Sequence, residues 1–262
     1  MPTPTPPPPI FSRVAPEAAG MLLYRAVKRG LLQAIEGKQL TPGAALPSET
    51  ALALAFGVSV GTVRKAVDEL VAEHIVVRRQ GRGTFVATHS ADRFLFQFFH
   101  VERSDGLREG PQVELISFER VHLSEDAAQA LGLRAGEPAF QIENRLSLQG
   151  RAIEHDLLTL PATLFKGLTE KRFRERPSTI YQLYQADFGI TVLRALERAR
   201  AVPLERAKAR VLGLAPGTPV LRVQRTALTF GDKPVEWRES TIHTAQHDYV
   251  QTLSRPVGWV GS

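Results

Sequence analysis

The sequence contains no cysteine and no long apolar run. Without cysteine there is neither a disulfide framework nor a thiolate ligand for a metal ion. No apolar stretch approaches the roughly 20 residues that a membrane-spanning helix needs. The first residues also lack the basic and apolar regions of a signal peptide. We therefore expect a cytoplasmic protein that has no membrane partner.

The signatures of the common enzyme classes are also missing. The chain has no P-loop or H-E-x-x-H motif, and no dinucleotide fingerprint follows a strand. Its seven histidines are scattered. His243 and His247 are four residues apart, but His243 falls in a strand-like stretch, and the adjacent His155 and Asp156 would point to opposite faces of a strand. The sequence therefore predicts no catalytic residue, no metal site and no cofactor.

Length and charge indicate two globular domains with a basic first part. A chain of 262 residues is long enough for two domains of ordinary size. The net charge is +6, and residues 1–90 hold 10 Lys and Arg against 6 Asp and Glu. This excess suits a nucleic-acid partner. Mild basicity is common, however, so the motifs that follow carry the prediction.

The most informative stretch is residues 46–86, LPSETALALAFGVSVGTVRKAVDELVAEHIVVRRQGRGTFV. Ser48 is a suitable N-cap for a short helix that Gly57 ends. Ser59 is a suitable N-cap for a second helix, whose apolar residues recur on one face. The last part predicts a β-hairpin around Gly-Arg-Gly. Helix, tight turn, helix and hairpin together are the pattern of a winged helix-turn-helix.

Seven residues of this stretch are candidates for DNA contact. The second helix has the size of a DNA major groove, and the hairpin tip is cationic. We expect Arg64 to contact a base edge or phosphate, Lys65 a phosphate, and Arg82 the minor groove. The candidates are Ser59, Thr62, Arg64 and Lys65 on the helix, and Gly81, Arg82 and Gly83 on the hairpin. Ser59 is equally well explained as a helix cap, and Lys65 as part of a solvated helix face.

The stretch resembles the DNA-binding domain of the GntR family of bacterial transcription regulators. The matching signatures are PG (Pro42-Gly43), LPSE (46–49), GVS (57–59), TVRKA (62–66) and QGRGTFV (80–86). The family has a helix before this motif, here residues 17–38, that packs beneath the helix-turn-helix. The sequence departs from the family at Thr50 and Val60, where arginines often read DNA. This leaves more of the readout to Arg64 and the hairpin.

The remaining chain predicts one larger domain between a linker and a short tail. The expected divisions are a proline-rich disordered tail (1–12), the winged helix-turn-helix (13–88), a linker (89–110), a second domain (111–252) and a C-terminal tail (253–262). Phenylalanines occupy positions 94, 96, 98 and 99. We expect them to pack in a core or between domains, although base stacking is an alternative.

The second domain contains an internal repeat. Residues 131–158 and 212–241 each begin with Leu-Gly-Leu and continue through a Gly-x-Pro turn, a strand, a turn and another strand. A repeat of this kind predicts a single α+β domain built on a mostly antiparallel sheet.

Residues 110–252 resemble the UTRA effector-binding domain of the HutC subfamily of GntR regulators, which has a chorismate-lyase-like α+β fold. The resemblance rests on residues 138–161, 178–190 and PVEWRES. It implies an effector pocket built by Arg145, Ser178, Thr179, Tyr181, Glu236 and Arg238. The family often has a second arginine at the position of Ser147. A single strand cation favours a carboxylate over a phosphosugar. Alternatively, Ser178 and Thr179 only cap a helix, and Glu236 and Arg238 form an ion pair.

Together the two resemblances imply a transcription regulator, with repression favoured over activation. We expect a homodimer on a palindromic double-stranded DNA operator, released when a small anionic effector binds the second domain. One alternative is a chorismate-lyase-like enzyme acting on a small aromatic acid, with an accessory winged helix. Another is a constitutive architectural DNA-binding protein. The sequence names neither the effector nor the operator.

Overall fold

The computed structural model describes residues 10–13, 23–89, 98–107, 109–176 and 178–251. Its contacts divide the chain into two compact units, one that ends at Thr88 and one that begins at His89. The predicted tails lie outside the described residues, except for residues 10–12. The predicted domain boundaries remain a prediction.

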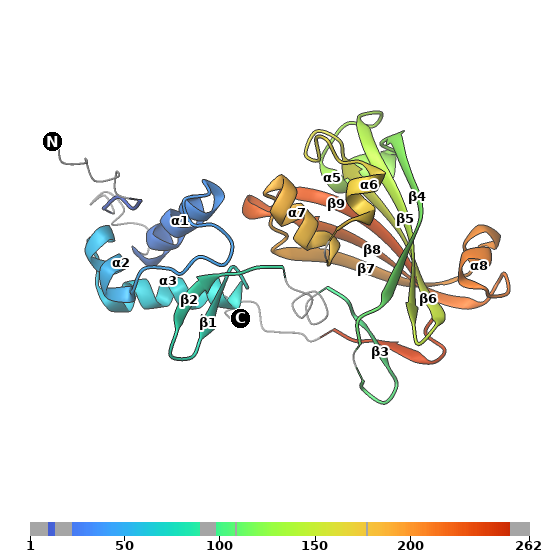
Figure 1. Cartoon of the computed structure of the whole chain (residues 1–262), viewed down its shortest axis with the longest axis horizontal. Coiled ribbons are helices and arrows are strands. Elements are labelled where there is room, and N and C mark those ends of the chain that lie inside the picture. Colours follow the sequence, from blue (N-terminus) through green and yellow to red (C-terminus); the bar gives the residue numbers. More distant parts are fainter. Residues whose placement is uncertain (1–9, 14–22, 90–97, 108, 177, 252–262) are drawn as a thin grey trace, which may run out of the picture. The chain divides into compact units, whose positions relative to one another are not determined.

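Within the described residues, the first unit has three helices and a two-stranded ribbon (Figure 1). These are α1 (Leu23–Glu36), α2 (Glu49–Phe56), α3 (Val60–Ala72), β1 (Val76–Arg79) and β2 (Gly83–Val86). Ser48 caps α2 by accepting a hydrogen bond from the backbone N–H of Ala51, and Gly57 ends that helix in a left-handed conformation (φ 68°). Ser59 caps α3 in the same way. The predicted helix, turn, helix and hairpin are therefore confirmed.

The core of the first unit lies between the apolar faces of its helices. Val27 and Leu31 of α1 and Val63 and Leu70 of α3 are fully buried. Among the described residues, no single helix is long and apolar enough to cross a membrane. Helices α2 and α3 taken together have the length and composition of a membrane span, but a bend of 112° separates them.

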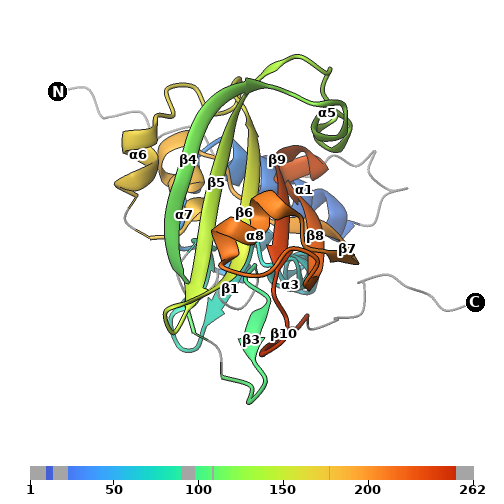
Figure 2. The ribbon, with the colours of Figure 1, turned by 90° about the vertical axis from the view of Figure 1, so that its right-hand side faces the viewer.

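The second unit is built on a six-stranded antiparallel sheet in the order β4-β5-β6-β9-β8-β7. Its strands are β4 (Gln112–His122), β5 (Pro138–Leu148), β6 (Arg151–Pro161), β7 (Arg194–Pro203), β8 (Pro219–Leu228) and β9 (Pro234–Ile242). The helices are α5 (Glu125–Leu131), α6 (Glu170–Arg174), α7 (Ile180–Phe188) and α8 (Arg206–Leu212), with a 3-10 turn at Phe230–Asp232. Helices α6 and α7 cover one face of the sheet, and α5 and α8 lie on the other (Figure 2).

The predicted repeat is visible in the backbone. Leu123 donates its N–H to the carbonyl of Glu137 at 2.9 Å, and Leu204 donates to Thr218 at the same distance. Each pair closes the turn between a short helix and the next strand. The two halves meet where β6 pairs with β9, so the strand order reads alike from either edge. The prediction of an α+β domain with an antiparallel sheet is confirmed.

The main core of the second unit lies between the sheet and α6 and α7. Its largest fully buried side chains are Ile142, Leu158, Leu160, Phe165, Phe173, Tyr181 and Tyr184. Phe98 joins this core, and Phe99 joins a neighbouring cluster with Leu146 and Ile242. Both phenylalanines thus pack in the interior rather than offering a base-stacking surface, whereas residues 94 and 96 lie outside the described residues.

The segment predicted as a linker contains structure of its own. A short strand, β3 (Val101–Arg103), pairs antiparallel with β10 (His247–Tyr249). Twelve residues earlier, the ring Nε2 of His89 accepts a hydrogen bond from the N–H of Val192 at 3.1 Å. The backbone N–H of His89 donates to the side-chain oxygen of Gln185, also at 3.1 Å. The chain is therefore fixed to the second unit at the first residue of that unit.

Candidate functional site

Arg64 lies in the first turns of α3 with 62% of its side chain exposed. Its Nε donates to Glu49 at the start of α2, at 2.9 Å. Glu49 also lies 3.6 Å from Arg78 of β1, whose other guanidinium nitrogen pairs with Asp68 at 2.6 Å. Exposed ion pairs of this kind contribute little to stability. A DNA phosphate can therefore replace the carboxylate partner of either guanidinium at a small cost in free energy.

The other predicted contacts on α3 also have structural partners. The hydroxyls of Ser59 and Thr62 are 2.8 Å apart, and Ser59 also accepts the N–H of Thr62. The Nζ of Lys65 lies 4.3 Å from the ring centroid of Tyr24 on α1, a cation–π distance. Helix capping and contact with α1 therefore account for these three residues even without DNA.

The hairpin tip depends on two glycines for its backbone shape. Gly81 (φ 68°) and Gly83 (φ 106°) adopt left-handed conformations that favour glycine. A Cβ at either position would meet nothing within 4 Å, so close packing is not the reason for the glycines. Arg82 lies exposed between them. The tip therefore presents a cation on a narrow ribbon, as a minor-groove contact requires.

A cavity of about 450 Å³ lies between β5, β6, β9 and the start of α7. We call it the α7 cavity. Its apolar lining consists of Val113, Leu146, Leu158, Phe173 and Ile180, and its polar lining of Asn144, Asp156, Arg176, Ser178, Thr179 and Arg238. This volume, with an apolar lining and a few polar groups, is typical of small-molecule sites.

Three polar atoms of the lining residues are buried without a partner among the described residues: Asn144 Oδ1, Arg176 Nε and Arg238 Nη2. Such atoms are rare in folded proteins because an unsatisfied buried group costs about 1–3 kcal/mol. Arg238 is otherwise well held, since its Nε donates to Glu236 and its Nη1 to Asp156, both at 3.0 Å. The residues that line the α7 cavity therefore hold two donors and one acceptor that lack a partner among the described residues.

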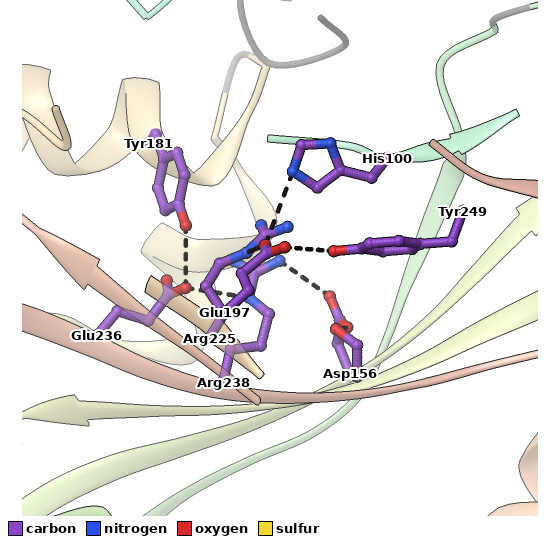
Figure 3. Close-up of polar contacts among 9 residues, drawn as sticks. His100, Asp156, Tyr181, Glu197, Arg225, Glu236, Arg238 and Tyr249 are labelled. Atoms are coloured by element: carbon purple, nitrogen blue, oxygen red, sulfur yellow. Dashed lines mark hydrogen bonds and ion pairs between the residues drawn. The ribbon is translucent and has the colours of Figure 1, made fainter. Parts of the chain in front are cut away.

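Two tyrosines of α7 donate hydrogen bonds to the carboxylate that holds Arg238, and Figure 3 shows one of them, Tyr181, pointing at Glu236. Tyr181 donates to Glu236 at 3.2 Å and Tyr184 at 2.6 Å. Burial, reinforced by the negative charge of Glu236, raises the pKa of both phenols. Both hydroxyls thus stay protonated and donate, which orients Glu236 and, through it, Arg238.

A second group of charges lies beside the first in Figure 3. Arg225 of β8 pairs with Glu197 of β7 at 2.5 Å. Tyr249 of β10 also donates to Glu197, and the His100 ring lies 3.7 Å from it. Burial alone would raise the pKa of Glu197, but Arg225 and the Tyr249 hydroxyl outweigh it and lower that pKa. Polar contacts thus connect the sheet to the β3–β10 ribbon.

The structure brings five of the six predicted effector residues together. Ser178, Thr179 and Arg238 line the α7 cavity, and Tyr181 and Glu236 support Arg238. Ser178 and Thr179 lie at the start of α7, and Thr179 also caps that helix by accepting the N–H of Gln182. The predicted ion pair between Glu236 and Arg238 is present as well, and their role in effector binding stays a prediction.

Arg145 is not brought to the cavity. It lies on the opposite face of β5, where its Nε donates to Glu114 at 3.1 Å. Neighbouring residues of a strand point to opposite faces, so a shift of one position exchanges a cavity residue for a surface residue. Asn144 and Leu146 are the cavity-facing residues of β5. The buried apolar positions 142, 146 and 148 carried a signal for this register, because they share a face with residue 144.

Asp156 and Arg176 are the other lining residues that sequence reasoning missed. Asp156 shares a face of β6 with Leu158, a placement that strand alternation predicts. Arg176 lies between α6 and α7, where no periodic pattern marks it. Among the described residues, no group of three His, Asp or Glu side chains is placed to hold a metal ion.

Comparison with known families gives a match for each of the two units. Residues 107–248 match the UTRA domain, and residues 23–86 match the bacterial regulatory proteins of the gntR family. The UTRA match alone covers more than half of the chain. The protein therefore belongs to the GntR family of bacterial transcription regulators, in the group that carries a UTRA domain.

Curated relatives cover most of the chain. The HTH-type transcriptional repressor NagR of Bacillus subtilis is 28% identical over 243 residues, which span 89% of this chain and 95% of NagR. The probable fructoselysine utilization operon transcriptional repressor of Escherichia coli is 27% identical over 223 residues, which span 83% of this chain and 89% of that protein. These matches confirm the prediction of a DNA-binding regulator and stand against the lyase-like enzyme.

A solved structure supports the architecture of the second unit. The ligand-binding domain of a GntR-family transcriptional regulator from Bordetella bronchiseptica is 31% identical and aligns with a TM-score of 0.56. The alignment covers 61% of this chain and 98% of that domain.

Proposed function

We propose that the protein is a repressor that binds a palindromic operator as a homodimer and leaves it when a small anionic metabolite occupies the α7 cavity. The observation that carries the proposal is the pair of buried, unpartnered arginine donors, Arg176 Nε and Arg238 Nη2, in a UTRA domain joined to a winged helix-turn-helix. Two relatives are named repressors, which supports repression over activation. Such a protein acts in the cytoplasm, where the chromosome is.

The DNA-binding half rests on α3 and the hairpin. A helix in the major groove and a cationic tip at the minor groove cover one half-site, and a dimer sets two such half-sites at helical spacing. Arg64 is the main candidate for base contact, because it is exposed and lies in the first turns of α3. Ser59, Thr62 and Lys65 contribute to a lesser extent, since other contacts already engage them.

The coupling rests on α7. Its first residues line the α7 cavity, and along its length Tyr181 and Gln185 contact His89. His89 directly follows Thr88, the last residue of the first unit before the division. A ligand that shifts the start of α7 therefore acts on the point where the chain leaves the DNA-binding unit. The protein leaves its operator if the ligand favours the chain geometry that binds DNA less well.

Fluorescence anisotropy of the full chain on DNA from upstream of its own gene tests this function. Random DNA of equal length and a series of salt concentrations provide the controls. We expect tight, site-specific binding that one pool of small organic metabolites weakens. Binding that is weak, steeply salt-dependent and indifferent to sequence would instead indicate a non-specific DNA-binding protein.

A further inference from the structure

We propose that the effector is an amphipathic monocarboxylate that also carries an N–H or O–H donor, and not a sugar phosphate. This inference rests on the proposed function, because it assigns the chemistry of the ligand in the α7 cavity. Three features of the cavity support it: an arginine without a carboxylate partner, the apolar lining and the buried acceptor.

The ion pairs of the cavity leave one arginine, Arg176, without a carboxylate partner among the described residues. Arg238 already contacts two carboxylates, Glu236 and Asp156, at 3.0 Å each. Among the described residues, no carboxylate pairs with Arg176, which donates Nη1 to the backbone oxygen of Phe173 and lies over that residue's ring. Burial lowers the pKa of Arg176, as expected for a cation without a carboxylate. A ligand with a single negative charge supplies the missing partner.

A second negative charge would face an acidic wall. Asp156 lines the same cavity and accepts hydrogen bonds from Arg238 and Ser240. A dianionic phosphate would bring its extra charge close to Asp156, with Arg176 as the single unpaired guanidinium of the lining. Like charges at short range in a buried site repel strongly. The position of Asp156 beside a single unpaired guanidinium therefore favours a carboxylate over a phosphate.

The shape of the lining favours an apolar body on the ligand. Leu146 and Leu158 come from the sheet, Phe173 from α6 and Ile180 from α7. The polyhydroxylated ring of a sugar would bury hydroxyl groups against these side chains, and each hydroxyl without a partner costs free energy. A hydrocarbon or heteroaromatic body loses nothing there and gains from burial.

The remaining polar atom is an acceptor, Asn144 Oδ1. Asn144 lies directly opposite Asp156 on neighbouring strands. The amide NH2 is best placed towards that carboxylate, since Asp156 only accepts, and this orientation leaves Oδ1 for the ligand. A ligand N–H or O–H satisfies it. A carboxylate at one end and a donor at the other thus complete the hydrogen bonding of all three buried atoms.

Calorimetric titration of the full chain with matched compounds tests the assignment. The probes are pyrrole-2-carboxylate and indole-3-carboxylate, the primary amide of each, the N-methylated analogue of each, and glucose 6-phosphate. We expect at least one acid to bind about tenfold or more tightly than both its amide and its N-methyl analogue. The amide loses the charged hydrogen bond to the arginine, and the N-methyl analogue leaves the buried acceptor without a donor. Glucose 6-phosphate should bind more weakly than that acid.

Two pairs of variants locate the binding. Arg176→Met should weaken the acid at least about tenfold and leave its amide unaffected, whereas Arg174→Met, at an exposed position two residues away, should change neither. Asn144→Leu should abolish the preference for the N–H acid over its N-methyl analogue. Arg145→Met, on the other face of the same strand, should preserve that preference. Thermal unfolding of each variant establishes that it is folded.

The inference is overturned if neither acid binds better than its amide, if glucose 6-phosphate binds more tightly than both acids, or if Arg176→Met binds the acid as the unmodified protein does. Operator binding, measured in parallel, separates this failure from that of the proposed function. Release of the operator by glucose 6-phosphate would refute the ligand class and leave the repressor intact. Loss of all site-specific DNA binding would refute the repressor, whatever the acids do.

Discussion

Arg64 is the side chain on which the DNA-binding half of this account most depends. It is exposed near the start of α3, and Glu49, with which it forms an ion pair, is itself partly exposed. We expect Arg64→Ala to weaken operator binding by about 1–3 kcal/mol and to relax base preference at one position. Thermal stability should change little, because the lost ion pair is exposed.

Anisotropy on a set of operators with single base changes measures this effect. Arg134→Ala, which removes an even more exposed cation from the second unit, is the control. An Arg64→Ala protein with unchanged affinity and unchanged base preference would remove Arg64 from the interface.

Glu154 makes stability depend on pH. It is buried on β6, and burial, with the neighbouring Asp156, raises its pKa well above the ordinary value. The folded chain thus keeps a proton that the unfolded chain releases, so stability falls as pH rises above the ordinary pKa of Glu, up to the folded-state pKa. Glu154→Gln mimics the protonated acid, so its stability relative to the unmodified protein should increase as pH rises.

Thermal unfolding of the two proteins from about pH 5 to about pH 8 measures this difference. The melting temperature of the Gln variant relative to that of the unmodified protein should increase steadily over the range. Glu119→Gln, at an exposed position of β4, should show no such trend. A constant difference for Glu154→Gln would mean that Glu154 is ionised in the folded protein.

At the scale of single residues, the sequence predicted several residues that line the α7 cavity but not the register of β5. Ser178, Thr179 and Arg238 were predicted and line the α7 cavity. Arg145 was inferred from a family pattern, and it lies one position away from the cavity-facing Asn144. Strand alternation turns such a small offset into opposite faces, and only the pairing of β5 with its neighbours fixes which face is buried.

Helix α7 connects the α7 cavity, the proposed ligand site, to His89, the first residue of the second unit. The ring of His89 lies 5.7 Å from that of Tyr181 and accepts the N–H of Val192. We expect His89→Phe, which keeps a ring but removes the acceptor, to leave effector and operator affinities largely intact when each is measured alone. The effect of the effector on operator affinity should shrink, from the roughly 1–3 kcal/mol typical of such coupling towards zero.

Anisotropy with and without saturating effector measures the coupling. His122→Phe, at an exposed position at the end of β4, controls for the change of residue type. If the His89→Phe protein is released from operator as completely as the unmodified protein, α7 does not transmit ligand binding through His89.

Elements defined by local signals were predicted well, and those defined by distant pairing were not. Ser48 and Ser59 cap the predicted helices, and the internal repeat predicted the two similar halves of the sheet. Strand β3 falls within the predicted linker. It is three residues long and pairs with a strand near the end of the unit. A strand of this length is too short to show an alternating apolar pattern, and it forms because it pairs with a strand that is distant in the sequence.

At the scale of the whole molecule, the account requires that two binding events oppose each other. An effector that lowers operator affinity must bind the operator-bound protein more weakly, by the same factor, because the coupling free energy is reciprocal. This reciprocity holds whatever the structural route between the sites. It also distinguishes a ligand-controlled repressor from a DNA-binding protein that happens to bind an organic acid.

The most direct test is calorimetric titration of the tightest-binding acid into the full chain, first free and then saturated with operator DNA. The account predicts weaker effector binding in the presence of operator, by the factor with which the effector weakens operator binding in anisotropy. Equal effector affinity in the two titrations would show that the α7 cavity and the DNA-binding unit are not linked, and would contradict the repressor mechanism.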